Sequence, residues 1–79
     1  MHIILWESGM VMAFDAAGKQ MPELQGHASE VLEKVMAATE DVRVRATFEL
    51  GKWRQGTTPC SREEFKLSAE RAPALEGGK

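Results

Sequence analysis

A nine-residue stretch in the middle of the chain alternates between apolar and other side chains without interruption. Successive side chains of a strand point to opposite faces, whereas a helix would scatter these apolar residues around its circumference. The pattern therefore predicts a strand over residues 42–50, with one face against a core and the other in water. The core face would carry Val42, Val44, Ala46, Phe48 and Leu50, and the wet face Arg43, Arg45, Thr47 and Glu49.

The dipeptide Gly51-Lys52 follows this strand and has glycine first, which suits a two-residue type II′ hairpin turn. In such a turn Gly51 takes a positive φ and Leu50 faces Trp53. We therefore predict a second, shorter strand that runs to about Thr57.

The N-terminal segment also reads as a hairpin, over residues 2–15. Two runs rich in β-branched, aromatic and Met residues, "HIILWE" and "MVMAFD", are separated by a Ser-Gly dipeptide. If that dipeptide is the whole turn, Leu5 faces Met12 and Ile3 faces Phe14. One face then carries these four side chains with Met10, and the other carries His2, Ile4, Trp6, Val11 and Ala13.

The clearest helix runs from about His27 to Thr39 and contains no Gly or Pro. Its apolar residues recur at the spacing of one buried stripe. The stripe consists of Ala28, Val31, Leu32, Val35 and Met36. In the segment before it, Pro22 and two glycines indicate a loop with one helical turn over residues 22–24.

The C-terminal region begins with a capping box, "SREE", at residues 61–64. The Ser61 hydroxyl of such a box accepts a hydrogen bond from the Glu64 amide. We predict a short helix from Arg62 with Phe65 and Ala69 facing inward. The alternative is a strand over "FKLSA", because its apolar residues also alternate.

Together these elements predict an α+β fold of order β-β-α-β-β with a short C-terminal helix. The economical arrangement is a small antiparallel sheet with the main helix packed on one face. Residues 1–72 would form a single domain and residues 73–79 a flexible tail. The predicted core comprises Leu5, Phe14, Val31, Leu32, Val35, Val44 and Phe48.

The net charge of the 79 residues is -2, with ten Lys and Arg against twelve Asp and Glu. This balance argues against strong binding to a phosphate backbone, which needs a positive field. Cys60 is the only cysteine, so no disulfide can form within the chain and a reducing, cytoplasmic setting is expected. We expect neither a signal peptide nor a membrane span, because the apolar runs are too short.

No catalytic motif occurs in the chain, and we expect neither enzyme activity nor a cofactor. The potential metal ligands His2, His27 and Cys60 are scattered, without the paired spacing of a structural zinc site. Cys60 precedes the predicted C-terminal helix, whose N-terminus would somewhat lower the pKa of its thiol.

The candidate binding surface is the sheet face opposite the main helix. In the predicted register it brings Ile4 and Trp6 close to Arg43 and Arg45, and aromatic residues with arginine are typical of interaction hot spots. An exposed apolar patch on so small a domain indicates a partner. The candidate partner-binding residues are Ile4, Trp6, Arg43, Arg45, Trp53 and Arg54.

Three alternatives remain open for this surface. Trp6 and Trp53 could stack on bases while the basic residues hold phosphates, which would make the protein a nucleic-acid binder. The sheet face could instead be buried in a homodimer. In the third alternative Arg43 and Arg45 are simply the wet side of an ordinary strand.

Two segments, "ESGMVMAFDAAGKQMPELQG" and "FELGKWRQGTTPCSREEF", resemble small accessory proteins encoded in bacteriophage and prophage genomes. The resemblance implies one small α+β domain without catalytic residues. It also implies a modulator or inhibitor that binds a host protein or protein complex in the host cytoplasm.

Overall fold

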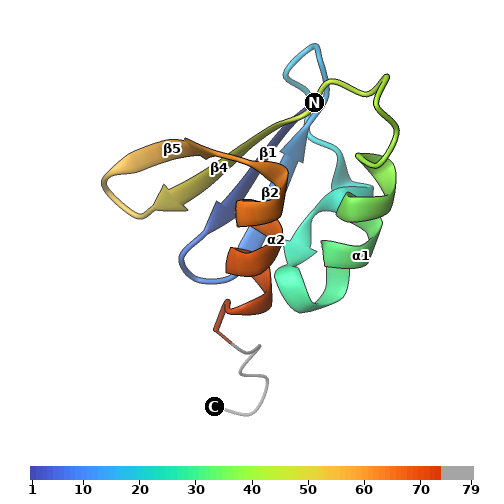
Figure 1. Ribbon diagram of the computed structural model, residues 1–79. Helices are drawn as coiled ribbons and strands as arrows, with labels where there is room; N and C mark the ends of the chain where they lie inside the picture. Colours follow the sequence, from blue (N-terminus) through green and yellow to red (C-terminus); the bar gives the residue numbers. More distant parts are fainter. Residues whose placement is uncertain (74–79) are drawn as a thin grey trace.

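The computed structural model describes residues 1–73 as an α+β domain with a five-stranded mixed sheet in the order β3-β2-β1-β4-β5. Both α-helices lie on the same side of the sheet (Figure 1). The strands are β1 (His2–Trp6), β2 (Met10–Phe14), β3 (Gly26–His27), β4 (Thr47–Lys52) and β5 (Gly56–Cys60). The helices are the 3-10 turn η1 (Pro22–Leu24), α1 (Ala28–Ala38) and α2 (Arg62–Glu70).

The prediction of a wholly antiparallel sheet is wrong, because the two central strands β1 and β4 run parallel. A parallel neighbour needs a crossover connection, and the segment that contains α1 supplies it. The other neighbouring strand pairs are antiparallel. The two-residue strand β3 was not predicted, since so short a run carries no periodicity.

The first hairpin is present, but its predicted register is wrong by one residue. Leu5 pairs with Val11 rather than Met12, and Ile3 pairs with Ala13 rather than Phe14. The connection has three residues instead of two, and it is closed by a 2.8 Å hydrogen bond from Gly9 N–H to the Trp6 carbonyl. Since a slip of one residue exchanges the faces of a strand, β2 turns Val11 and Ala13 to the core.

The alternating run is a strand only from Thr47 onward, so the prediction of a strand from residue 42 is wrong. Asp41 organises a turn instead: its carboxylate accepts a 2.9 Å hydrogen bond from Arg43 N–H, and its carbonyl one of 2.9 Å from Val44 N–H. Aspartate competes with strand pairing in this way through its own local hydrogen bonds. Val42 is consequently 95% exposed.

The second hairpin turns two residues later than predicted. Gly51 and Lys52 belong to β4, and the turn occupies residues 53–55, closed by a hydrogen bond of 3.1 Å from Gln55 N–H to the Lys52 carbonyl. Leu50 pairs with Thr58 and does not face Trp53. The positive φ angles fall on Arg54 and Gly56, and Gly51 is not among the residues with positive φ.

Both helix predictions are confirmed. His27 caps α1 and accepts a hydrogen bond from Ser29 N–H. Ser61 caps α2 and accepts one from Glu64 N–H, so the alternative of a strand over residues 65–69 is excluded. The helical turn predicted over residues 22–24 is η1. No helix of residues 1–73 is long and apolar enough to cross a membrane.

The core lies between the sheet and the two helices. Phe65 of α2 is fully buried, and its ring centroid lies 5.1 Å from that of Phe48 on β4. Of the predicted core, Leu5, Val31, Val35 and Phe48 are confirmed and Leu32 packs against the core as a half-buried residue. The prediction that Val44 and Phe14 lie in the core is wrong, because neither belongs to this cluster.

The predicted tail over residues 73–79 lies outside the described residues except for Pro73. The Pro73 carbonyl is 2.7 Å from Nε2 of His27, so the main chain is still attached to the domain at this residue. Because Nδ1 of His27 accepts from Ser29 N–H, Nε2 carries the hydrogen and donates to Pro73.

Candidate functional site

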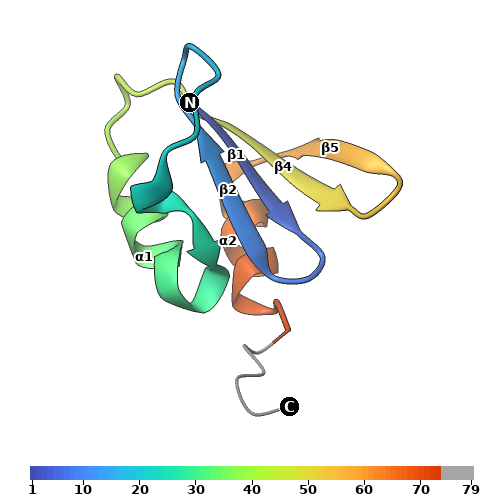
Figure 2. The same cartoon turned by 180° about the vertical axis from the view of Figure 1, so that it is seen from behind.

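The surface of the sheet that faces away from α1 and α2 is covered by no helix within residues 1–73 (Figure 2). We call this surface the open face. Alternation along the paired strands assigns its side chains, none of which belongs to the hydrophobic core cluster. The open face carries His2, Ile4, Trp6, Met10, Met12, Phe14, Thr47 and Glu49.

Two tryptophans from different hairpins meet at one end of the open face. The rings of Trp6 and Trp53 are stacked, with centroids 4.9 Å apart and planes inclined by 9°. Trp6 is half-buried and Trp53 is 57% exposed, so Trp53 is the outer ring of the stack. We call these residues the tryptophan pair.

Gly51 provides the space in which the inner ring lies. It is the partner of Trp6 in the parallel register, and a Cβ atom added to it would lie 2.6 Å from Cε3 of Trp6. Such a separation is shorter than any van der Waals contact between carbon atoms. Sequence reasoning assigned Gly51 to a turn and missed this packing role.

Ile4 occupies the centre of the open face but is only 9% exposed. Its strand partners are Met12 on β2 and Glu49 on β4, whose side chains flank it on the same face. Ile4 therefore forms the floor of the apolar part of the surface, while Met10 at 43% exposure is more accessible.

The polar part of the open face is a row of hydrogen-bonded side chains. His2 Nε2 lies 2.6 Å from the Glu49 carboxylate, and His2 Nδ1 lies 2.7 Å from the Thr47 hydroxyl. Thr57 on β5 donates a 2.9 Å hydrogen bond to the other oxygen of Glu49. The row links three neighbouring strands and fixes the polar border of the apolar surface.

Arg43 and Arg45 do not flank Trp6, which corrects the predicted cluster. Both precede Thr47, the partner of His2, whereas Trp6 pairs with Gly51 at the other end of the parallel strands. Four residues of strand, about 13 Å at 3.3 Å per residue, separate these two ends.

Arg43 is instead engaged in the turn that Asp41 organises. One terminal guanidinium nitrogen lies 2.7 Å from the Asp41 carboxylate. The hydrogen bonds from the side chain and backbone of Arg43 lower the pKa of Asp41, and the same pair raises the pKa of Arg43. The carbonyl of Arg45 accepts a hydrogen bond of 2.8 Å from the N-terminal amino group. The side chain of Arg43 and the main chain of Arg45 therefore stabilise the loop before β4.

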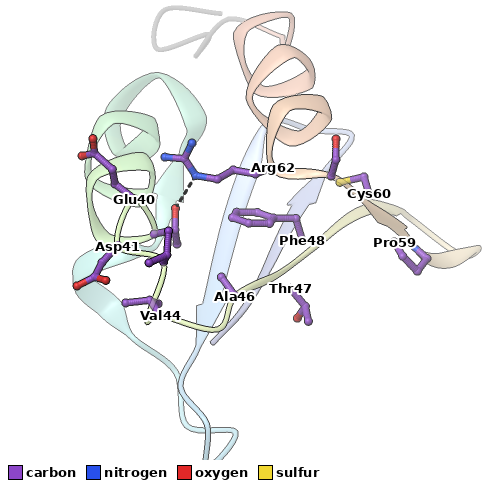
Figure 3. Close-up of a pocket in the computed structure, with 12 residues that line it drawn as sticks. Glu40, Asp41, Val44, Ala46, Thr47, Phe48, Pro59, Cys60 and Arg62 are labelled. Atoms are coloured by element: carbon purple, nitrogen blue, oxygen red, sulfur yellow. Dashed lines mark hydrogen bonds between the residues drawn. The ribbon is translucent and has the colours of Figure 1, made fainter.

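A cavity of about 530 Å³ lies between the end of α1, the loop before β4 and the start of α2 (Figure 3). Arg62 reaches across it and donates hydrogen bonds to the Met36 carbonyl at 2.8 Å and to the Thr39 hydroxyl at 3.3 Å. A cation at the C-terminal end of a helix offsets the helix dipole. Arg62 therefore holds α1 and α2 together.

Cys60 borders the same cavity. Burial raises the pKa of its thiol, and the nearby carboxylates of Glu64 and Glu49 raise it further. This is the reverse of the lowered pKa expected from the helix N-terminus. The neutral thiol is a poor nucleophile and a poor metal ligand.

Two of the three potential metal ligands, His2 and His27, have other partners. His2 is paired with Glu49, His27 caps α1, and Cys60 lies at the end of β5. Among residues 1–73 no group of three or more His, Cys, Asp or Glu side chains is placed to hold a metal ion.

A smaller cavity, of about 260 Å³, lies where β1 and β4 end beside the last turn of α2. We call it the end groove. Its lining includes Leu5, Glu7, Leu50, Lys52, Ser68 and Arg71. Alternation places the side chains of Leu5 and Leu50 on the helix-facing side of the sheet. Trp6 and Gly51 also line the end groove, so it adjoins the tryptophan pair, although Trp53 itself is not among the lining residues.

No family model, curated protein or solved structure matches this chain. The resemblance to phage accessory proteins therefore stays a prediction.

Proposed function

We propose that the protein is a non-enzymatic protein-binding module that contacts its partner through the open face. The observation that carries this proposal is the tryptophan pair, whose outer ring is 57% exposed at one end of the open face. Tryptophan is enriched among the residues that dominate binding energy. A large exposed apolar side chain on a small domain supports the same function.

The stacking contact orients the Trp53 ring in the free protein. Its ring rests on Trp6, which in turn fills the space above Gly51. A side chain that is already oriented loses less conformational entropy on association, which otherwise costs about 0.5–1.5 kcal/mol. Trp6 lies on β1 and Trp53 is the first residue of the turn after β4, so the stack on Trp6 holds the outer ring in place in the free protein.

The revised surface differs from the predicted one. Trp6, Trp53 and Ile4 remain in it, with Trp53 as the accessible residue and Ile4 as the floor. Arg54 follows Trp53 directly and is exposed, so it stays at the rim. Arg43 and Arg45 do not belong to the revised surface, because they precede β4 at the end of that strand away from Trp6.

Capture followed by a binding measurement tests this function. The folded protein is immobilised, retained proteins are identified, and the affinity of the purified partner is measured for wild type, Trp53→Ser and Leu67→Ser. Leu67 is the matched control because it is 54% exposed but lies on α2. We expect Trp53→Ser to weaken binding by about 2 kcal/mol or more, as at a hot spot, and Leu67→Ser to leave it unchanged.

Two results would contradict the proposal. One is that the folded protein retains no partner at micromolar concentration. The other is that Leu67→Ser weakens binding as much as Trp53→Ser does. The role as a phage-derived modulator or inhibitor of a host complex belongs to the same proposal, and the identity of the captured partner tests it.

Nucleic-acid binding is the second candidate, because the exposed Lys52 and Arg54 flank Trp53 at the tip of the second hairpin. Stacking of a base on tryptophan beside cationic side chains is a known mode of single-strand binding. The net charge of -2 and the distance of Arg43 and Arg45 from this tip oppose it. A salt-sensitive mobility shift that Arg54→Glu abolishes would favour this candidate over protein binding.

The open face could also bind a second copy of the chain. Sedimentation velocity at two concentrations distinguishes a homodimer from a monomer that binds a different partner. A dimer that Trp53→Ser dissociates would assign the tryptophan pair to self-association.

A further inference from the structure

We propose that the end groove binds an apolar side chain from an acidic segment of the partner protein. This inference rests on the protein-binding function proposed above and adds the chemistry of the partner. The end groove adjoins the tryptophan pair through Trp6, but its cationic residues Lys52 and Arg71 are not part of the open face, so the two surfaces are separable by mutation.

The floor of the end groove is apolar and preformed. Leu5 and Leu50 are partners in the parallel pair β1–β4, and they are respectively 4% exposed and half-buried. A 3.0 Å hydrogen bond from Glu7 N–H to the Gly51 carbonyl continues the pairing beyond the end of β1. The floor is therefore held by main-chain hydrogen bonds.

The size of the end groove suits a side chain better than a cofactor. Its volume is about 260 Å³, whereas sites for small molecules commonly measure about 300–1,000 Å³. A single leucine or phenylalanine side chain inserted between the sheet and α2 would cover the floor. Removing such a side chain from water is favourable, so it can act as the anchor of the bound segment.

Charges on the walls of the end groove select an acidic segment. Lys52 stands on the sheet wall and Arg71 at the carboxyl end of α2, and Glu7 is the one carboxylate among the lining residues. Within residues 1–73 none of these three side chains forms an ion pair. The lining thus carries net positive charge on a chain of net charge -2, and an extended segment in the groove meets a cation on each wall.

Three blocked synthetic peptides test the proposal. The first has a central leucine flanked by two acidic residues on each side, the second has lysines in place of the acidic residues, and the third has glycine in place of leucine. Binding is followed by the NMR shifts of the Leu5 and Leu50 methyl groups. We expect the acidic leucine peptide to bind at least about tenfold more tightly than either of the others, as one anchor and two ion pairs imply.

Charge reversal provides the second measurement. The double variant Lys52→Glu, Arg71→Glu should lose the preference for the acidic peptide and prefer the lysine peptide. The matched control is Lys19→Glu, Lys34→Glu, which makes the same charge change at two exposed sites outside the end groove and should keep the original preference. The variant Ser68→Phe, which fills the groove without a charge change, should weaken binding of the acidic peptide.

Several results would overturn the proposal. In the first, all three peptides bind with equal affinity. In the second, the control variant Lys19→Glu, Lys34→Glu changes the peptide preference as much as Lys52→Glu, Arg71→Glu does. In the third, the peptide shifts only NMR signals of residues outside the groove. Binding that occurs only after truncation behind Pro73 would assign the groove to the chain's own C-terminal segment. Because Trp53 does not line the end groove, Trp53→Ser should keep the preference for the acidic peptide, whereas Lys52→Glu, Arg71→Glu should lose it. Failure of the open-face function and failure of the groove function therefore give different results.

Discussion

The indole ring of Trp6 lies where a side chain at position 51 would have to be. An added Cβ on Gly51 would come within 2.6 Å of Cε3 and 2.8 Å of Cζ3 of Trp6. The glycine on β4 therefore determines where the aromatic ring from β1 can rest. Because Trp53 stacks on that ring, Gly51 also determines the position of the outer tryptophan.

We expect Gly51→Ala to destabilise the fold by about 1–3 kcal/mol, the usual cost of an additional group in a filled space. The cost should largely disappear in the double variant Trp6→Leu, Gly51→Ala, because the smaller side chain makes room for the methyl group. Urea unfolding of the single and double variants measures both effects. Lys52→Ala is the control at the neighbouring exposed position, and an equal loss of stability there would contradict the packing role.

The second prediction compares Val35 and Val42, two valines that the sequence patterns place on core-facing sides of their elements. Val35 of α1 is fully buried, whereas Val42 is 95% exposed. We expect Val35→Ala to cost about 2 kcal/mol or more, from lost burial and the remaining cavity. The same substitution at Val42 should change the midpoint of unfolding very little. Similar costs for both would mean that Val42 packs against the core as the alternation predicted.

The helices were predictable because their signals are local. The stripe of α1 repeats at helical spacing over three turns, and Ser61 with Glu64 marks the first turn of α2. In both cases the interactions that decide the structure lie within a few residues of one another. Sequence patterns therefore gave the correct bounds to within about two residues.

The sheet was predictable only in part, because its registers depend on turns and on distant strands. Nothing in the sequence distinguishes a two-residue connection at Ser8 from the three-residue one, yet that difference exchanges the two faces of β2. The parallel pairing of β1 with β4 joins residues more than forty positions apart. For this reason the packing of Trp6 on Gly51 could not be predicted, although the sequence does name both tryptophans as candidate binding residues.

The prediction of a strand over the whole alternating run was wrong for a different reason. Its first half contains a local competitor, since Asp41 binds the amide of Arg43 with its side chain and the amide of Val44 with its carbonyl. An aspartate before an alternating run is a recognisable turn signal. This signal predicts a shorter strand that does not contain Arg43.

The third prediction uses the same turn. Arg43 lowers the pKa of Asp41 through side-chain and then backbone hydrogen bonds. A lowered pKa means that the ionised carboxylate stabilises the turn at neutral pH and that this stabilisation is lost as the pH falls through the pKa of the folded state. Carboxyl NMR titration should therefore show Asp41 titrating below its ordinary range. Arg43→Ala should raise the pKa of Asp41, and Arg45→Ala, the control with the same charge change, should not.

The fourth prediction concerns the reactivity of Cys60. Because burial, Glu64 and Glu49 all raise the pKa of its thiol, little thiolate is present near neutral pH. Alkylation by iodoacetamide in the native state should be slower than in the urea-unfolded chain at the same pH. Glu64→Gln should accelerate it, whereas Glu63→Gln, a neighbouring change of equal charge, should have little effect. Native alkylation as fast as in the unfolded chain would contradict the raised pKa.

The last prediction distinguishes the two rings of the tryptophan pair. Trp6 lies between the backbone of β4 and the ring of Trp53, and its Nε1 atom is buried without a hydrogen-bond partner in the described part of the chain. A variant that retains only Trp53, Trp6→Phe, should be quenched efficiently by iodide, because its indole is exposed. The variant that retains only Trp6, Trp53→Phe, should be quenched less, since a phenyl ring still covers the inner indole.

Binding should reverse this contrast. If a partner docks on the open face, it covers the outer ring first, so Trp53 in the Trp6→Phe variant should lose its accessibility to iodide when the partner is added. The inner ring in the Trp53→Phe variant should change little. Equal quenching of both rings in the free protein would mean that the pair opens in solution. The outer tryptophan would then not be preorganised, and the entropy argument for the open face would no longer hold.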